Sequence, residues 1–185
     1  MPYVKWGPWV NGGAPGIEAA ALDRIETQYD EAVAQYPNVI KMIRKTADEA
    51  VNNSTVLQND DHLFFSVGVN EVWEFLLYLQ IQSENDGAGN YPNFKTTFSI
   101  PAAATLSRLP PYHTIATVLL SNLNGTGTIV LAEAGLAAPC SYWARFIYTG
   151  GANAGTVQFQ WAQNTARVAD SKVLTNSYII AHKLA

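Results

Sequence analysis

The order of apolar and polar residues divides this chain into one helix near the start and a long series of strands. From Ile17 onward, apolar residues recur at alternating spacings of three and four positions, which is typical of a helix with one apolar stripe. That stripe consists of Leu22, Ile25, Tyr29, Ala32 and Tyr36. So short a helix is marginal in water unless its apolar face is packed. We therefore expect another surface to cover the stripe.

Both ends of this helix are marked by proline and glycine. Pro37 disfavours helical geometry at the preceding residue, so we expect the helix to end at or before Tyr36. Residues 1–16 contain Trp6, Trp9 and several Gly and Pro, a composition that does not propagate a helix. We interpret residues 1–37 as an attachment arm and helix, and residues 38–185 as a separate β domain.

Beyond the boundary, apolar residues alternate with a period of two, which predicts strands. The clearest case is residues 155–163, where Val157, Phe159 and Trp161 alternate with glutamines. We expect the glutamines of this segment, Gln158, Gln160 and Gln163, on a solvated face. Turn-forming segments rich in Gly and Asn separate the strands, and no convincing helical pattern lies between them. We therefore predict a mainly β, antiparallel jelly-roll sandwich. Its expected strands are 39–46, 55–58, 62–68, 72–82, 94–100, 115–121, 127–132, 141–149, 155–163 and 176–184.

Two of these strands are apolar on both faces. In residues 72–82, Leu76 and Tyr78 lie opposite the main apolar row, and in residues 141–149 the same holds for Trp143. A strand of this kind must be covered twice, once by its own core and once by something else. The second cover could be an N-terminal segment, a loop or a neighbouring copy of the chain. Together with the apolar stripe of the helix, we interpret it as oligomerisation with closed cyclic symmetry and expect a homotrimer. The predicted oligomer interface comprises Tyr29, Tyr36, Leu76, Tyr78 and Trp143.

Composition and charge exclude several functional classes. The chain has 185 residues, of which 48% are hydrophobic and 14% charged, a balance that excludes an intrinsically disordered protein. Its net charge is −4 and its Lys and Arg form no basic stripe, so we expect no nucleic-acid partner. The longest apolar run, 75–79, is far below the roughly 20 residues of a membrane-spanning helix, so we expect no membrane insertion. The start lacks the apolar core of a secretory signal.

Candidate chemistry in the sequence is sparse. The densest polar group is Asp60, Asp61 and His62, which could bind a cation but is more simply interpreted as solvated turn residues. A single cysteine, Cys140, allows no internal disulfide and no zinc site built on several thiolates. No motif of a hydrolase, phosphate loop or metalloprotease occurs. We therefore expect no enzyme activity, no catalytic residue, no bound metal and no cofactor.

One segment resembles a known group of proteins. Residues 9–26, WVNGGAPGIEAAALDRIE, resemble the N-terminal segment of many tailed-bacteriophage virion proteins, in which Trp, a Gly turn, Pro and a helix recur in that order; Asp23 stands where Asn is more usual. Residues 45–61, 155–164 and 177–181 look like parts of small phage β modules. The resemblance implies a jelly-roll head, often trimeric and similar in shape to tumour necrosis factor, carried next to the virion body.

From the residues and the resemblance together we expect a non-enzymatic virion structural protein. Its localisation would be the virion, assembled in the host cytoplasm. The expected role is a homotrimeric capsid decoration or cementing protein that docks onto the major capsid protein or a tail component. The docking residues would be Trp6, Trp9, Ile17, Leu22 and Ile25. The alternative is a short tail fibre or baseplate-attached receptor-binding protein, whose exposed aromatic residues stack on a host surface glycan.

Overall fold

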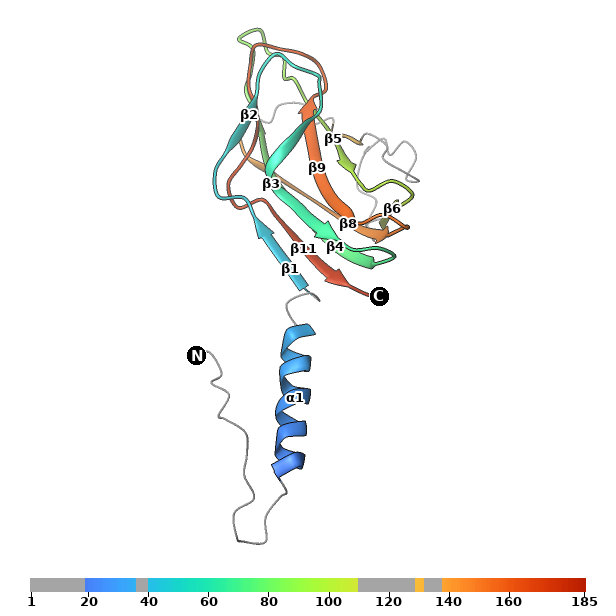
Figure 1. Cartoon of the computed structure of the whole chain (residues 1–185). Helices are drawn as coiled ribbons and strands as arrows, with labels where there is room; N and C mark the ends of the chain where they lie inside the picture. The colour runs from blue at the N-terminus through green and yellow to red at the C-terminus, as the bar shows by residue number, and fades with distance from the viewer. Residues whose placement is uncertain (1–18, 36–39, 110–128, 132–137) are drawn as a thin grey trace. The chain divides into compact units, whose positions relative to one another are not determined.

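The computed structural model describes residues 19–35, 40–109, 129–131 and 138–185 of the chain. The chain divides into two compact units, Met1–Val39 and Ile40–Ala185. In the first unit the described element is the helix α1, Ala19–Gln35, which lies within the range expected from the apolar stripe (Figure 1). The boundary predicted between residues 37 and 38 falls outside the described residues.

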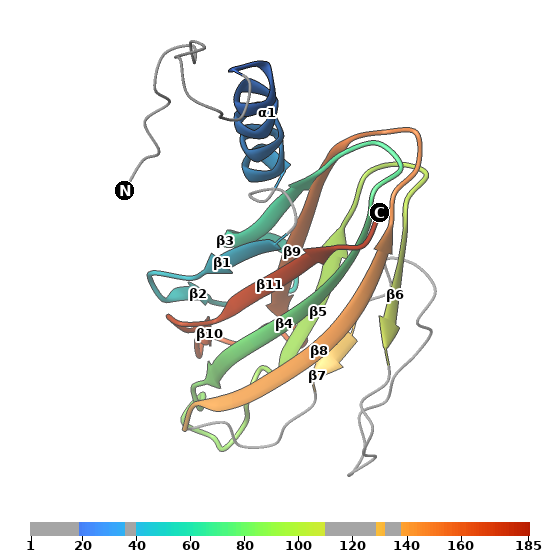
Figure 2. The same cartoon turned by 90° about the horizontal axis from the view of Figure 1, so that it is seen from below.

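The second unit is a sandwich of two antiparallel sheets, which confirms the prediction of a mainly β, antiparallel chain (Figure 2). In the larger sheet, β6 pairs with β8 and β8 pairs with β4. Along its other edge β4 pairs with β11 and with β10. The outermost strands on that side are β1, paired with β11, and β2, paired with β10. The smaller sheet has the order β3, β9, β5, β7. The strand bounds are β1 Ile40–Arg44, β2 Glu49–Val51, β3 Gln58–Val67, β4 Val72–Ser83, β5 Phe94–Ser99, β6 Thr105–Leu109, β7 Ile129–Leu131, β8 Cys140–Thr149, β9 Gly155–Gln163, β10 Ser171–Val173 and β11 Tyr178–Lys183.

The strict alternation of β4 explains how the sandwich forms its core. Every second residue of this strand, from Trp73 to Ser83, is buried between the sheets, and the residues between them are partly exposed. Aromatic rings from both sheets meet there: Phe75 stacks on Phe146 at 5.0 Å and contacts Phe98 edge to face at 5.3 Å. Burying such rings between two layers is the main source of stability in a sandwich.

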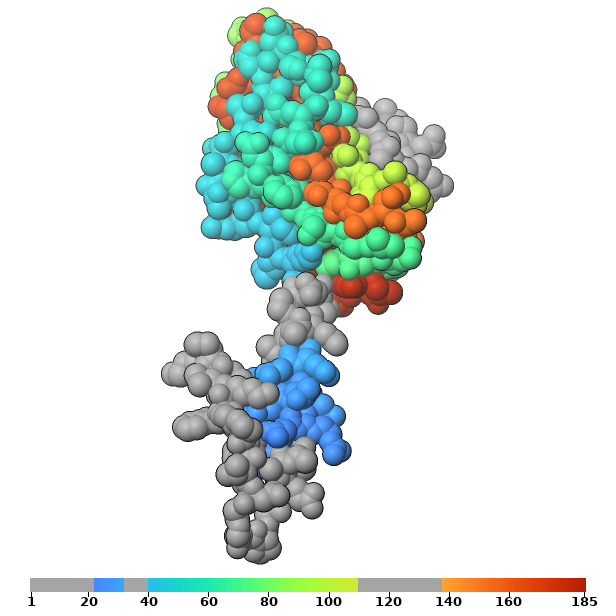
Figure 3. All heavy atoms as spheres, in the orientation of Figure 1, coloured from blue at the N-terminus to red at the C-terminus, as the bar shows by residue number. Residues whose placement is uncertain are grey.

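The C-terminal residues extend the pairing of β11 with β4. The backbone N–H of Val72 donates to the carbonyl of Ala185 at 2.9 Å, and Leu184 donates to the carbonyl of Val72 at 2.7 Å. In the space-filling view the red C-terminal residues lie beside the green segment that leads into β4 (Figure 3). The last strand, β11, is therefore held over most of its length between β4 and β1.

Several predicted elements need correction. The strand expected at 55–58 is wrong except for its last residue, because the chain turns at Asn53, with a φ of 48°, and Val56 is exposed. The described structure instead has the short strands β2, β6 and β10, which the pattern did not reveal. The strand expected at 115–121 lies outside the described residues.

Two polar groups expected in solvent are buried. Gln163 is fully buried, where its side-chain amide donates to the carbonyls of Val51 at 3.1 Å and Ala169 at 2.6 Å. Asp60 is 1% exposed and forms an ion pair with Lys45, so the interpretation of Asp60 as a solvated turn residue is wrong. Both groups are stable in the interior because their hydrogen bonds are satisfied there.

Candidate oligomer interface

The outer side of the larger sheet carries a continuous apolar surface. Residues that pair directly across neighbouring antiparallel strands project on the same side, so the register defines which side chains meet. One row across β11, β4 and β8 is Tyr178, Tyr78 and Trp143. The next row, across β1, β11 and β4, is Met42, Ile180 and Leu76. We call these six residues the outer apolar face.

Much of this face is open to solvent in the single chain. Met42 is 78% exposed and Trp143 is 52% exposed, whereas Ala144, Phe146 and Tyr148, which point inward from the strand of Trp143, are almost fully buried. A shallow hollow beside them is lined by both strands of the β1 and β11 pair, including Met42, Tyr178 and Ile180. Large apolar side chains that gather on one sheet face usually mark a surface that binds something.

The tyrosines give the outer apolar face a rigid centre. The rings of Tyr78 and Tyr178 stack with centroids 4.9 Å apart and planes 20° apart. The hydroxyl groups of Tyr78 and Ser141 are 2.9 Å apart and share a hydrogen bond, and the Gln80 amide donates to the Tyr78 hydroxyl at 3.4 Å. The hydrogen bond with Ser141, and then the one from Gln80, lowers the pKa of Tyr78 below its ordinary value. Fixed rings of this kind lose little conformational entropy on binding.

Charged residues of both signs border the apolar centre. Arg145 pairs in register with Leu76 and forms an ion pair with Glu74. Arg44 lies opposite Tyr178 and donates to the side-chain carbonyl of Asn176 at 2.6 Å. An apolar centre with a polar rim is the usual composition of a protein interface.

Three of the residues predicted for the oligomer interface therefore lie together. Leu76, Tyr78 and Trp143 are neighbours on the outer apolar face, on adjacent strands. Tyr29 lies on α1, in the other unit, and is 52% exposed. The position of Tyr36 is outside the described residues.

The predicted docking residues are only partly described. Trp6, Trp9 and Ile17 lie outside the described residues, whereas Leu22 and Ile25 lie on α1. Ile25 is 56% exposed although it belongs to the apolar stripe. Its neighbour Glu26 is only 9% exposed.

Sequence reasoning missed half of the outer apolar face, namely Met42, Tyr178 and Ile180. Tyr178 and Ile180 are two positions apart in a predicted strand, so their common side was readable from the alternation. Their position beside Leu76 and Tyr78 was not, because it depends on the pairing of β11 with β4, about a hundred residues earlier in the chain.

Other kinds of site find little support in the described part of the chain. Its His, Cys, Asp and Glu side chains form no cluster of three that could hold a metal ion. Its one helix is not long and apolar enough to cross a bilayer. No protein-family model matches this chain, and no curated protein matches it in sequence. The functional argument therefore depends on the fold and on the outer apolar face.

Proposed function

We propose that this chain is a homotrimeric structural protein of a bacteriophage virion, in which the β domain forms a head and residues 1–37 attach it to the particle. The observation that carries the proposal is the outer apolar face, which a single copy of the chain leaves exposed at Met42 and Trp143. The reason for proposing a virion as its location is the resemblance of residues 9–26 to phage attachment segments. The favoured role is decoration or cementing of the capsid.

The order of strands supports a jelly-roll fold for the head. In a jelly roll of eight strands, one sheet contains the first, eighth, third and sixth strands, and the other contains the second, seventh, fourth and fifth. Counting β1 with β2 as the first strand and β10 with β11 as the eighth, the larger sheet follows the former order through β4 and β8. The smaller sheet follows the latter order as β3, β9, β5 and β7. On this assignment β6 is an addition at the edge beside β8.

Two separate apolar surfaces favour other copies of the same chain as the partner. The outer apolar face is one, and the stripe of α1 is the other, with Ile25 and Tyr29 each more than half exposed. Parallel copies of one chain would cover both surfaces at once, since identical helices and identical heads come together in a cyclic assembly. The bordering charges of both signs, at Glu74 and Arg145, allow copies to approach without net repulsion.

The oligomeric state is the first test. Light scattering on the purified chain at micromolar concentration should give three times the chain mass of 20.2 kDa. A mass equal to one chain at that concentration would overturn the trimer. A stable mass of two or four chains would overturn the threefold symmetry and leave the outer apolar face as the contact to be mapped.

Attachment to the particle is tested by removing the N-terminal unit. Deleting residues 1–36 should leave a folded β domain that no longer joins particles of the phage that encodes the chain. An immunoblot of purified particles, compared with the full-length chain at equal expression, measures this. Continued incorporation of the shortened chain would contradict a docking role for Trp6, Trp9, Ile17, Leu22 and Ile25. Hundreds of copies per particle would indicate the capsid, and a handful the tail.

A receptor-binding role is the second candidate, and Trp143 is the observation that favours it. Its ring is 52% exposed, next to the hydroxyl groups of Tyr78 and Ser141, and sugars commonly stack on such rings beside hydroxyl groups. Saturable binding of the purified protein to host cells or to a glycan, lost in Trp143→Ala, would support this role over capsid decoration. This role requires Trp143 to stay open to solvent instead of lying between copies, and absence of saturable binding would exclude it.

A further inference from the structure

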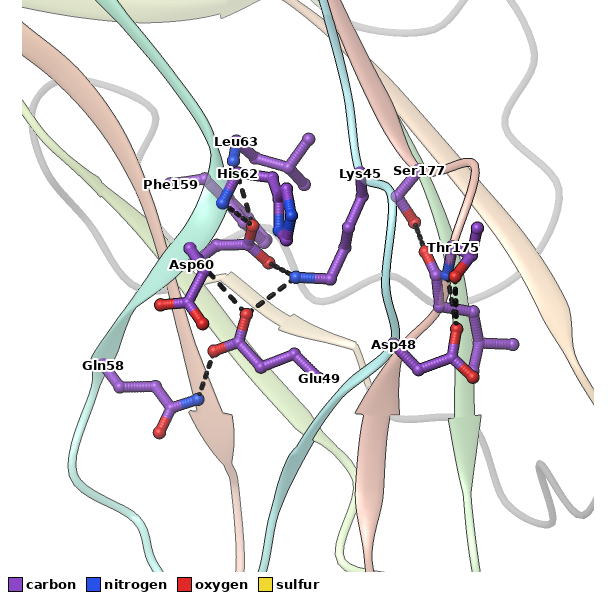
Figure 4. Close-up of polar contacts among 12 residues, drawn as sticks. Lys45, Asp48, Glu49, Gln58, Asp60, His62, Leu63, Phe159, Thr175 and Ser177 are labelled. Atoms are coloured by element: carbon purple, nitrogen blue, oxygen red, sulfur yellow. Dashed lines mark hydrogen bonds and ion pairs between the residues drawn. The ribbon is translucent and has the colours of Figure 1, made fainter.

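A buried lysine lies between two carboxylates where the two sheets meet (Figure 4). Lys45 follows β1 in the larger sheet, and its ammonium nitrogen is 2.8 Å from Oδ2 of Asp60 on β3, in the smaller sheet. The same nitrogen is 2.7 Å from Oε2 of Glu49 on β2. The side chains of Lys45 and Asp60 are both 0% exposed, and that of Glu49 is 14% exposed. This is the most deeply buried ion pair in the described part of the chain.

The second oxygen of Asp60 has its own pair of donors. Oδ1 accepts the backbone N–H groups of His62 and Leu63, each at 2.9 Å, because β3 bulges between Asn59 and Phe64. Two backbone donors on one carboxyl oxygen are the arrangement that stabilises negative charge on a tetrahedral intermediate of acyl transfer. Asp60 therefore has one oxygen held by fixed donors and the other in contact with an amine.

The position of Glu49 is fixed as well. Its Oε1 accepts the side-chain amide of Gln58 at 2.7 Å, and its Oε2 accepts the backbone N–H of Asp61 at 3.2 Å. Glu49 is thus held against Lys45 as a base that can accept a proton from the amine. An amine, a carboxyl group and an adjacent base are the three parts that nucleophilic acyl transfer requires.

We propose that Lys45 and Asp60 form an intramolecular amide bond, with Glu49 carrying the protons. Lys45 gives one proton to Oδ2 of Asp60, and its nitrogen attacks Cγ, so that negative charge develops on Oδ1 between the N–H groups of His62 and Leu63. Glu49 takes a proton from the attacking nitrogen and delivers it to Oδ2. The C–Oδ2 bond then breaks and water leaves. An ammonium and a carboxylate become one amide and one water molecule, Glu49 ends as it began, and no oxidant or cofactor is consumed.

Burial and fixed geometry favour this reaction over the ordinary ion pair. Charges removed from water are costly, and an amide removes both of them at once. Groups held at contact distance react as if at very high concentration, which offsets the unfavourable equilibrium of amide formation in water. The ion pair of Lys183 and Glu71, at the same 2.8 Å, has side chains 31% and 23% exposed and no such enclosure. We expect no bond there.

Intact mass spectrometry of the purified full-length chain tests the proposal directly. The expected mass is that of the sequence less one water molecule, and a protease digest should yield one branched peptide that joins the segments containing Lys45 and Asp60. A folded chain with the full sequence mass, and with those two segments released as separate peptides, would overturn the proposal. This measurement needs no variant, and because the bond lies within one β domain its result is independent of trimer formation and of the virion role.

Variants of the three residues identify the chemistry. Glu49→Gln should leave the folded chain at its full mass, because removing a general base typically slows proton transfer about 10²–10⁴-fold. Asp60→Asn should lose the mass of ammonia instead of water, since the leaving group is then an amide nitrogen. Glu71→Gln, in the partly buried ion pair with Lys183, is the control and should still lose water. Bond formation at an unchanged rate in Glu49→Gln would overturn the role of that residue.

Discussion

Removing Trp143 should weaken the trimer far more than it weakens the fold. About 52% of this residue is exposed in the single chain, and the proposed trimer would cover it. A fully buried Trp covers about 200 Å², so the newly covered part is about 100 Å², worth roughly 2.5 kcal/mol per subunit at ~25 cal/mol per Å². Three subunits lose about 7.5 kcal/mol, which is roughly five orders of magnitude in the dissociation constant. The half-dissociation concentration depends on its square root, so Trp143→Ala should raise it about two to three orders of magnitude.

Sedimentation velocity over a dilution series measures this shift. The matched control is Phe64→Ala, which removes a ring that is 45% exposed on β3 of the other sheet. Phe64→Ala should dissociate at the same concentration as the unaltered chain. Thermal unfolding of both variants checks that each remains folded. An unchanged dissociation curve for Trp143→Ala, or an equal shift for Phe64→Ala, would refute the argument that the outer apolar face holds the copies together.

Three further predictions concern single residues of the β domain. Partial burial raises the pKa of Glu71, but hydrogen bonds from Lys183, the backbone of Gly68 and the indole of Trp73 outweigh it and lower the pKa to about 2. The stability that Glu71 contributes is thus complete above its ordinary pKa of 4.5 and falls as pH drops toward 2; Glu71→Gln should flatten acid unfolding curves across that window. Gly151→Ala should cost about 1–3 kcal/mol in urea unfolding, because its Cβ would overlap a backbone carbonyl. Gln163→Leu should cost about 2–4 kcal/mol, because it leaves several buried backbone groups unpaired.

Each of these has a neighbouring control. Glu84→Gln changes a carboxylate that pairs with a lysine on the surface, and should leave the acid unfolding curve unaltered. Ala152→Ser, at an exposed position beside Gly151, should be neutral. Gln160→Leu removes a single exposed hydrogen bond, to Asn59, and should cost well under 1 kcal/mol. Equal effects for a variant and its control would show that the assigned contact is not the cause.

The sequence pattern predicted those strands in which apolar and polar residues alternate over the whole length of the strand. The alternation in β4 placed Leu76 and Tyr78 on the side opposite the core, and the structure agrees. The short strands β6 and β10 contain Ser, Thr, Lys and Arg at most positions and have no apolar period. Their pairing with β8 and β4 determines them, and that pairing lies outside the local sequence.

The contact between Lys45 and Asp60 was hidden for a related reason. Fifteen positions separate the two residues, and Lys45 follows a strand in one sheet while Asp60 lies in a bulge in the other. Neighbouring acidic residues ahead of an apolar run are usually solvated, so local reasoning placed Asp60 at the surface. Lys45 reaches Asp60 only because the two sheets pack together, and that packing cannot be predicted from the local pattern of a single sequence.

The break between β1 and β2, where Lys45 lies, also shortens one free edge of the larger sheet. Residues 45–48 separate β1, with five residues, from β2, with three, so that border never presents a long row of unpaired backbone groups. Long, flat borders recruit strands from other molecules and start aggregation. Because this edge consists of the two short strands β1 and β2, we expect it to resist the addition of a strand from another molecule. In the proposed assembly, neighbouring copies would then meet through side chains and not by strand pairing at this edge.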